Sequence, residues 1–262
     1  MRKIFILVLI VVVAFSSSAF AEAAKVGLLT KSNLEEAQFK SDAYSVTKWA
    51  LRNQKDEEFT YYDDLLTMLL ALNAGDIDEL DLPKVVAEYI VTRNPDLKIS
   101  CVACIEPEIH FAFGFKKDNP ELCKKFNEAL SEMRKDETLR KLQEEYLRYA
   151  GKTEPTPVKF DFFPDSETIN IAVTGDLPPL DYTSEDGAAA GFNTAILAEI
   201  GRRLNVNIRI ITVNSVARVA ALMSGRADGV FWFMLNNFDL PENIIASEPY
   251  YTFDEFLHIR KK

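Results

Sequence analysis

The chain has 262 residues, of which 40 are Asp or Glu and 30 are Lys or Arg, so its formal net charge at pH 7 is −10. Such an acidic surface argues against nucleic acid or an anionic membrane surface as a partner. The length is sufficient for one large domain or for two lobes of ordinary size.

The N-terminus has the pattern of a secretory signal. Arg2 and Lys3 precede an apolar run over residues 4–15, and three serines and an Ala-Phe-Ala sequence follow it. We therefore predict that residues 1–21 are a signal peptide cleaved after Ala21 and that the protein is exported to the periplasm. The run is short for a membrane span, and an uncleaved anchor is the alternative. No Cys follows it to accept a lipid, and loss of the two positive charges leaves a net charge of −12.

From residue 22 the chain alternates short apolar runs with helical patterns, which is typical of an α/β unit, and we predict one such unit over residues 22–108. A helix is expected over residues 63–74, ending at Gly75. Its predicted apolar side consists of Leu65, Leu66, Leu69 and Leu72. Pro83 is expected at the first position of another helix, which runs to Arg93. The other predicted elements are strands at 25–29, 58–62, 77–82 and 97–104 and a helix at 33–53.

The chain contains three cysteines, Cys101, Cys104 and Cys123. In an oxidising compartment Cys101 and Cys104 could close a small disulfide, or one of them could pair with Cys123. Because the Cys-x-x-Cys pair ends a strand-like run and does not open a helix, we interpret the cysteines as structural and not redox-active. The two histidines, His110 and His258, are not spaced with the cysteines, so no metal site and no cofactor are expected.

Residues 109–150 are predicted to form a strand, at 109–115, and two helices. The first helix begins near Pro120 and the second covers residues 137–149. Residues 151–168 contain three prolines and are predicted to be an extended linker.

Residues 169–252 repeat the α/β plan, and residues 253–262 form a last predicted strand. The expected strands lie at 169–173, 206–213 and 227–233, and the helices at 191–204 and from Ser215 to Gly225. Both units contain Ala-Leu-x-x-Gly-x-x-Asp, at 71–78 and 221–228, at a turn from helix to strand. Such a repetition is expected of a protein with two lobes.

Several motifs of the second unit resemble the opening lobe of the family 3 extracellular solute-binding proteins, which deliver polar amino acids and related solutes to membrane transporters. They are the strand "INIAV", Pro178-Pro179, the "DG…GFN" turn into a helix, "ALMSGRAD" and "SEPYY". The first unit resembles the other lobe in "KVGLLTKSN" and "GDIDELDLPKVVAEYI", and residues 113–147 resemble the closing strand and helices. The resemblance implies an α/β, two-lobed periplasmic-binding-protein-like fold of type II, with lobes joined by two hinge strands.

The order of the two lobes is reversed with respect to the family. The lobe that ends in "EPYY" comes first in the family and second here, so the sequence resembles a circular permutant. Residues 109–150 then hold one hinge strand and the closing helices, and residues 253–262 the other hinge strand, with 253–259 expected beside 109–115. A half-copy left from a tandem duplication, paired with another molecule, is the alternative.

The resemblance places a ligand in a cleft formed by loops at strand ends and by helix N-termini. The residues that it assigns to ligand binding are Thr30, Lys31, Asn33, Asp176, Leu177, Ser215, Trp232 and Phe233. Other roles are open for some of them, because only one of two adjacent strand residues can face the cleft, Lys31 could be a solvated loop residue, and Asp176 could cap the turn before Pro178. Tyr250 and Tyr251 are expected to pack at the hinge.

Two positions depart from relatives that bind free amino acids. Those relatives carry an Arg for the ligand carboxylate at the position of Leu240 and an acidic residue for the ligand ammonium near Pro83. Both ionic anchors are therefore missing here, and an ordinary free amino acid is not the expected ligand.

We predict a periplasmic solute-binding protein without enzymatic activity that captures a small polar or amphipathic solute for an ABC-type uptake transporter. Its expected partners are the solute and a membrane permease. A monomer is expected, with a swapped dimer as the alternative. A ligand-free sensory or scaffold module would also fit the missing anchors. A dehydratase-like or peptidoglycan-acting enzyme is disfavoured, because no spacing of a nucleophile and a base stands out.

Overall fold

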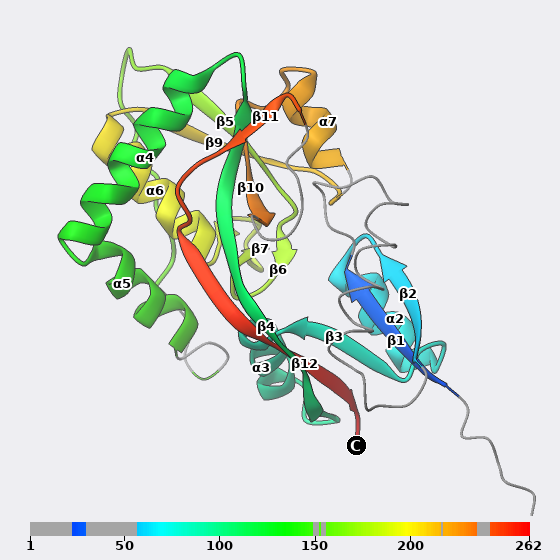
Figure 1. The fold of residues 1–262 in the computed structure, drawn as a ribbon. Coiled ribbons are helices and arrows are strands. Elements are labelled where there is room, and N and C mark those ends of the chain that lie inside the picture. Colours follow the sequence, from blue (N-terminus) through cyan, green and yellow to red (C-terminus); the bar gives the residue numbers. More distant parts are fainter. Residues whose placement is uncertain (1–22, 30–56, 149–151, 153–155, 216, 235–241) are drawn as a thin grey trace, which may run out of the picture.

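The computed structural model describes residues 23–29, 57–148, 152, 156–215, 217–234 and 242–262. In this part of the chain, the strands form one large mixed sheet and a small sheet of β6, β7 and β8. The large sheet has the order β2-β1-β3-β12-β4-β10-β5-β9, and β11 pairs with β4 outside this path. The strands β4 and β12 lie in the middle of the order and connect the two units of the molecule (Figure 1).

The described residues of the first unit form three parallel strands and two helices. They are β1 (Ala24–Leu29), β2 (Glu57–Tyr62), α2 (Leu65–Ala74), β3 (Glu79–Pro83) and α3 (Lys84–Arg93). Pro83 is the last residue of β3 and precedes α3, so it lies one position earlier than predicted. The predicted helix over 33–53 lies outside the described residues.

Helix α2 has well-formed caps at both ends. The Asp64 side chain accepts a hydrogen bond from the Thr67 amide at 2.7 Å, and Gly75 follows the helix with a φ of 85°, a left-handed value that favours glycine. The buried side consists of Leu65, Met68, Ala71 and Leu72. Leu66 is 65 % exposed, so its predicted place on the apolar side is wrong. The reason is the helical period, because Met68, three residues after Leu65, shares its side, whereas Leu66 is turned away by about 100°.

Where the structure describes the second unit, it carries four helices and the remaining strands. They are α4 (Pro120–Lys135), α5 (Thr138–Gln143) with a π-helical turn (Glu144–Arg148), β5 (Thr168–Val173), β6 (Asp176–Leu177), β7 (Asp181–Thr183), β8 (Ala189–Ala190), α6 (Phe192–Leu204), β9 (Asn207–Thr212), α7 (Ala217–Met223), β10 (Gly229–Met234) and β11 (Ile244–Ala246). Strand β5 is parallel to both β9 and β10. Helices α4 and α5 are tied to α6, because Arg203 of α6 pairs with Asp136 after α4 at 2.6 Å and donates to the Thr138 hydroxyl of α5 at 3.2 Å.

The two shared strands are β4 (Leu97–Lys116) and β12 (Tyr251–Lys261), which run antiparallel. The sequence predicted two separate strands at 97–104 and 109–115, which is wrong, because β4 is continuous over 20 residues. The predicted pairing of residues 253–259 with 109–115 is correct only at Phe253, which lies opposite Ile109. Residues 255–261 pair with the earlier part of β4, down to Leu97.

The ladder between the shared strands is interrupted near its middle. Phe253 lies opposite Ile109 and Glu255 lies opposite Ile105, so residues 106–108 of β4 face the single residue Asp254 of β12. An imbalance of this kind is a β-bulge, which bends the strand and increases its local twist. Pro107, which has no N–H to donate, lies within the bulge, a position where proline is tolerated in a sheet.

Aromatic side chains fill the region where β12 enters the second unit. Tyr250 lies 4.6 Å from Phe113 between ring centroids, and Tyr251 lies 6.2 Å from Phe111 and 5.6 Å from Phe192. Both tyrosines are buried, at 2 % and 8 % exposure. They pack at the shared strands, as the sequence analysis expected.

None of the helices in the described ranges combines the length and the apolar character needed to cross a membrane.

Replacing Gly191 by Ala is expected to destabilise the protein by roughly 2–5 kcal/mol, from a left-handed backbone and overpacking. Gly191 precedes α6 with a φ of 103°, and an added Cβ would lie 2.6 Å from the Leu180 carbonyl oxygen. That oxygen accepts a hydrogen bond from the Asn193 amide and cannot move aside freely.

The matched control is Gly187→Ala. Gly187 also has a positive φ, 83°, but no atom lies within 4 Å of an added Cβ, so only the backbone strain of roughly 1–2 kcal/mol is expected. Urea unfolding measures both variants, and equal losses at the two positions would contradict the steric argument.

Candidate functional site

The carboxyl ends of the parallel strands form one edge in each unit. In the first unit β2 leads to α2 and β3 leads to α3, so two helix N-termini lie at that edge. In the second unit the residues after β5 and β9 lie at the corresponding edge. In open α/β sheets ligands bind outside the carboxyl ends of the strands. A contact between Asp176, which follows β5, and the N-terminus of α2 brings the two edges together.

The loop after β5 is held in one conformation by Asp181. Its Oδ2 accepts hydrogen bonds from the Gly175 amide at 2.9 Å and from the Thr174 hydroxyl at 3.2 Å. The Thr183 amide donates to the Gly175 carbonyl oxygen at 3.0 Å. Gly175 has a φ of 69°, and an added Cβ would lie 3.3 Å from the Thr183 hydroxyl oxygen. A glycine is therefore favoured at this turn.

Asp176 lies at the end of this loop, as the sequence predicted, and it reaches the other unit. Its Oδ2 accepts a hydrogen bond from the backbone amide of Leu65 at 3.1 Å. Leu65 is the first residue of α2, whose N-terminal amides carry partial positive charge. The neighbouring predicted residue, Leu177, is 4 % exposed and belongs to the apolar core.

Ser215 lies before α7 and is bound to an arginine that the sequence analysis missed. Arg218 donates from Nη2 to the Ser215 hydroxyl at 3.2 Å and from Nη1 to the Phe231 carbonyl oxygen at 2.8 Å. The guanidinium is only 2 % exposed. Burial lowers the pKa of Arg218, and the nearby Asp181 and Asp176 oppose this change. The available signal was a single charge in the otherwise small and apolar stretch "ARVAALM".

Two polar side chains are buried next to the loop that follows β5. Asp181 is 1 % exposed and Asn193 is fully buried. Among the described residues, Asp181 Oδ1 and both amide atoms of Asn193 have no hydrogen-bond partner. Burial raises the pKa of Asp181 to about 6, and the Gly175 amide and the Arg218 charge act in the opposite direction.

Five of the eight predicted ligand residues are not placed with their side chains. Thr30, Lys31 and Asn33 lie outside the described residues, as does Leu240. For Trp232 and Phe233 only the backbone in β10 is described, where Phe233 lies opposite Ala112. The register shifts between Val230 and Phe233, so simple alternation does not assign one of the two side chains to the cleft.

Pro83 is buried at the end of β3 and offers no charge at the first unit's edge. The next residue, Lys84, forms an ion pair with Glu255 of β12. The cation that begins α3 is therefore already paired within the protein.

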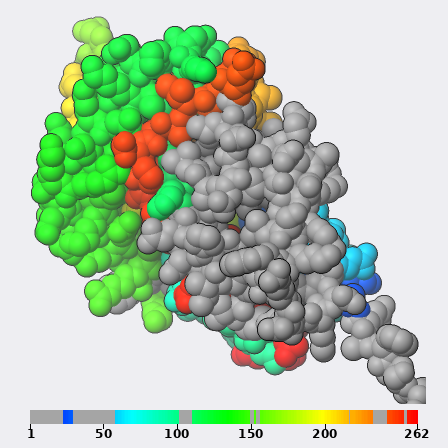
Figure 2. All heavy atoms as spheres, in the orientation of Figure 1, coloured from blue at the N-terminus to red at the C-terminus, as the bar shows by residue number. Residues whose placement is uncertain are grey.

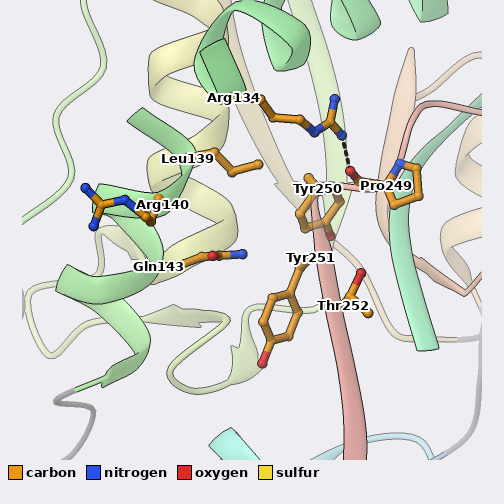
Figure 3. A pocket seen from close by; sticks show the side chains of 8 residues that line it. All are labelled: Arg134, Leu139, Arg140, Gln143, Pro249, Tyr250, Tyr251 and Thr252. Carbon is orange, nitrogen blue, oxygen red and sulfur yellow. Dashed lines mark hydrogen bonds between the residues drawn. The ribbon is translucent and has the colours of Figure 1, made fainter. Parts of the chain in front are cut away.

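A separate pocket of about 330 Å³ lies beside the start of β12 (Figure 3). Its lining comes from the end of α4, from α5 and from the chain entering β12: Arg134, Leu139, Arg140, Gln143, Pro249, Tyr250, Tyr251 and Thr252. Arg134 donates to the Pro249 carbonyl oxygen, and Arg140 pairs with Glu137 and Glu144. On the face shown in Figure 2, the orange-red segment before β12 lies against the green helices α4 and α5. None of the predicted ligand residues lines this pocket.

The structure places one cysteine side chain, Cys123, as a buried free thiol whose Sγ lies 3.4 Å from the Ala246 carbonyl oxygen. A disulfide from Cys101 or Cys104 to Cys123 is thus not formed. Burial raises the pKa of the Cys123 thiol, which disfavours its reactive thiolate form. Across the described ranges, His, Cys, Asp and Glu side chains do not gather in a group that could hold a metal ion.

The sequence profile of the bacterial extracellular solute-binding proteins, family 3, matches residues 12–149 and 169–262. The chain belongs to this family. It is thus a member of a family of extracellular binding proteins and has the predicted α/β, two-lobed fold of type II periplasmic binding proteins. No curated protein matches the chain.

Solved structures are similar at low sequence identity. The ligand-binding component of an ABC-type import system from Staphylococcus aureus, with zinc bound, shares 11 % identity and a TM-score of 0.46 over 91 % of this chain and 66 % of its own. The GluR0 ligand-binding core in complex with L-glutamate shares 12 % identity and a TM-score of 0.45 over 92 % and 86 %. A nutrient-binding protein from Burkholderia cenocepacia bound to methionine shares 10 % identity and a TM-score of 0.42 over 91 % and 85 %.

The buried carboxyl of Asp181 predicts a pH dependence of stability. Because its pKa is raised in the folded protein, its contribution is fully present below the unfolded pKa near 4 and is lost as the pH rises through about 6. A pKa about 2 higher in the folded protein than in the unfolded chain corresponds to roughly 3 kcal/mol of the free energy of unfolding. Asp181→Asn keeps an acceptor for Gly175 but cannot ionise, so its stability relative to the native protein should rise by that amount between pH 4 and pH 7.

Urea unfolding at four pH values across this window measures the difference. Asp118→Asn, which removes an exposed carboxylate, controls for the change in net charge. A difference between Asp181→Asn and the native protein that does not vary with pH would contradict the assignment.

Proposed function

We propose that the protein is a periplasmic solute-binding protein that captures a small solute between its two units and presents it to an ABC-type uptake transporter. The observation that carries this proposal is the meeting of the two strand-end edges, where Asp176 of the second unit contacts the N-terminus of α2. Family membership supports binding, not catalysis, as the activity. Cleavage of residues 1–21 and docking to a permease belong to the same proposal.

We further propose that the ligand is not an ordinary free α-amino acid. The buried Pro83 supplies no carboxylate for an ammonium, and position 240 is Leu, which supplies no guanidinium for a carboxylate. Leaving one charge of a buried pair without its partner costs on the order of 3–5 kcal/mol, enough to abolish micromolar affinity. A polar or amphipathic solute with a flat or apolar part fits the proposed contacts better. Of the predicted residues, these contacts are Thr30, Lys31, Asn33, Asp176, Trp232 and Phe233, whereas Leu177 belongs to the apolar core and the Ser215 hydroxyl is already bonded to Arg218.

The ligand proposal predicts the outcome of a thermal-shift screen. Arginine, glutamine and glutamate should leave the melting temperature nearly unchanged. A bound solute, identified by mass spectrometry of small molecules released from the purified protein, should stabilise it by roughly 2.7 kcal/mol at a hundred times its dissociation constant. A large shift with one of the three amino acids would contradict the proposal, and the absence of any retained or stabilising solute would favour the scaffold alternative.

We also propose that the order of the two units is a circular permutation of the family order. In the sheet, Ile259 lies opposite Leu80, and Leu80 lies opposite Gly27, so the end of β12 is level with the start of β1. Two strand spacings separate them, roughly 10 Å. A linker of about four residues spans such a distance.

A chain rebuilt in the family order should therefore fold. It would carry residues 157–262, a four-residue Gly-Ser linker and then residues 24–148. We expect the same far-UV circular dichroism and a single cooperative unfolding transition, because both strands that join the units are retained. A rebuilt chain that is soluble but does not unfold cooperatively would refute the permuted arrangement within one chain.

A further inference from the structure

We infer that Asp176 and Tyr182 form a latch by which the second unit holds the first. The two residues lie directly opposite each other in the small sheet, Asp176 on β6 and Tyr182 on β7. Residues opposite each other in an antiparallel pair project their side chains to the same face. Both side chains contact the first unit, Asp176 at α2 and Tyr182 at α3.

The polar half of the latch is a charge-assisted hydrogen bond. Asp176 Oδ2 accepts from the Leu65 amide at 3.1 Å, at the positive end of α2. Asp64 already serves two later amides of the same turn, those of Thr67 and Met68. Asp176 therefore does not replace a missing cap. It binds an amide that Asp64 does not bind, from a position 111 residues away.

The aromatic half is a contact between Tyr182 and Tyr89 of α3. Their ring centroids lie 6.4 Å apart with an interplanar angle of 42°, within the range of favourable aromatic pairs. Tyr89 also packs against Arg93, whose guanidinium carbon lies 4.9 Å from the ring centroid. One cross-strand pair thus contacts two helices of the opposite unit.

The latch is rigidly mounted on the second unit. Asp181, next to Tyr182 in β7, binds the Gly175 amide directly before Asp176. These two contacts therefore supply part of the free energy that keeps the units together, and the latch must open before the units can separate. The idea that the latch opens when a solute enters rests on the proposed function. The existence of the latch does not rest on it.

Two pairs of variants test the polar half. Asp176→Ala removes the acceptor, and Asp176→Asn keeps a neutral one. Leu65→Pro removes the donor, and Leu65→Ala loses similar packing but keeps the amide. Proline is suited to the first helical position, and Asp64 before it has the extended backbone, φ −144° and ψ 155°, that a residue preceding proline adopts.

The first readout is the radius of gyration from small-angle X-ray scattering, on protein freed of small molecules by unfolding and refolding. Asp176→Ala and Leu65→Pro should each give a larger radius than the native protein and than Leu65→Ala. The double variant Asp176→Ala/Leu65→Pro should give no further increase over either single variant. Asp176→Asn should lie in between. Tyr182→Ala should also increase the radius, and Tyr182→Phe, which keeps the ring, should not.

The second readout is hydrogen exchange of individual amides by NMR. In Asp176→Ala the Leu65 amide should exchange about 10-fold faster, the effect of losing a hydrogen bond of this kind. The Thr67 amide, bound by Asp64, should keep its rate and serves as the internal control.

The latch is refuted if the Leu65 amide is unprotected in the native protein, or if Asp176→Ala exposes that amide without changing the radius. If Leu65→Pro does not fold, the Asp176 and Tyr182 variants still test whether the latch exists. Because no solute is added, failure to find a ligand would count against the proposed function and leave this result unaffected.

Discussion

The antiparallel pairing of β4 with β12 is the constraint on which the remaining structure depends. Each unit contributes its own parallel strands, yet both are completed by the same two strands, β3 pairing with β12 and β10 with β4. Two backbone ladders therefore determine how the units face each other. Where residues 106–108 bulge opposite Asp254, the ladder is already interrupted. Smaller register shifts follow between Phe256 and Leu257 and between His258 and Ile259. An interrupted ladder has fewer hydrogen bonds to break, so these positions favour a turn of one unit against the other.

Most elements of the fold could be predicted from local patterns, and the exceptions have physical causes. Pro107 and its acidic neighbours interrupt the apolar pattern, so the sequence indicated two strands, whereas a bulge accommodates them within one. Leu66 is apolar, but its place on the helix turns it outward. Composition alone could not distinguish these cases, because tertiary pairing and helix orientation decide them.

The candidate site was only partly predictable for a related reason. Asp176 could be placed in the cleft loop by its position after a strand, but its partner, the Leu65 amide, carries no side-chain signature and lies 111 residues away. Arg218 was overlooked because charged helix residues are usually solvent-exposed. Here the guanidinium instead links the start of α7 to β10, through Ser215 and the Phe231 carbonyl oxygen.

The buried charges explain how a small loop can act on a whole unit. Burying Asp181 is costly, as its raised pKa indicates, yet the same carboxylate binds the Thr174 hydroxyl and the Gly175 amide and so determines the course of the loop. Arg218 lies close enough to offset part of that cost without taking the oxygen that holds the loop. The loop in turn presents Asp176 directly opposite Tyr182. Through its hydrogen bonds to Thr174 and Gly175, a single buried carboxylate therefore shapes the loop with which the second unit meets α2 and α3.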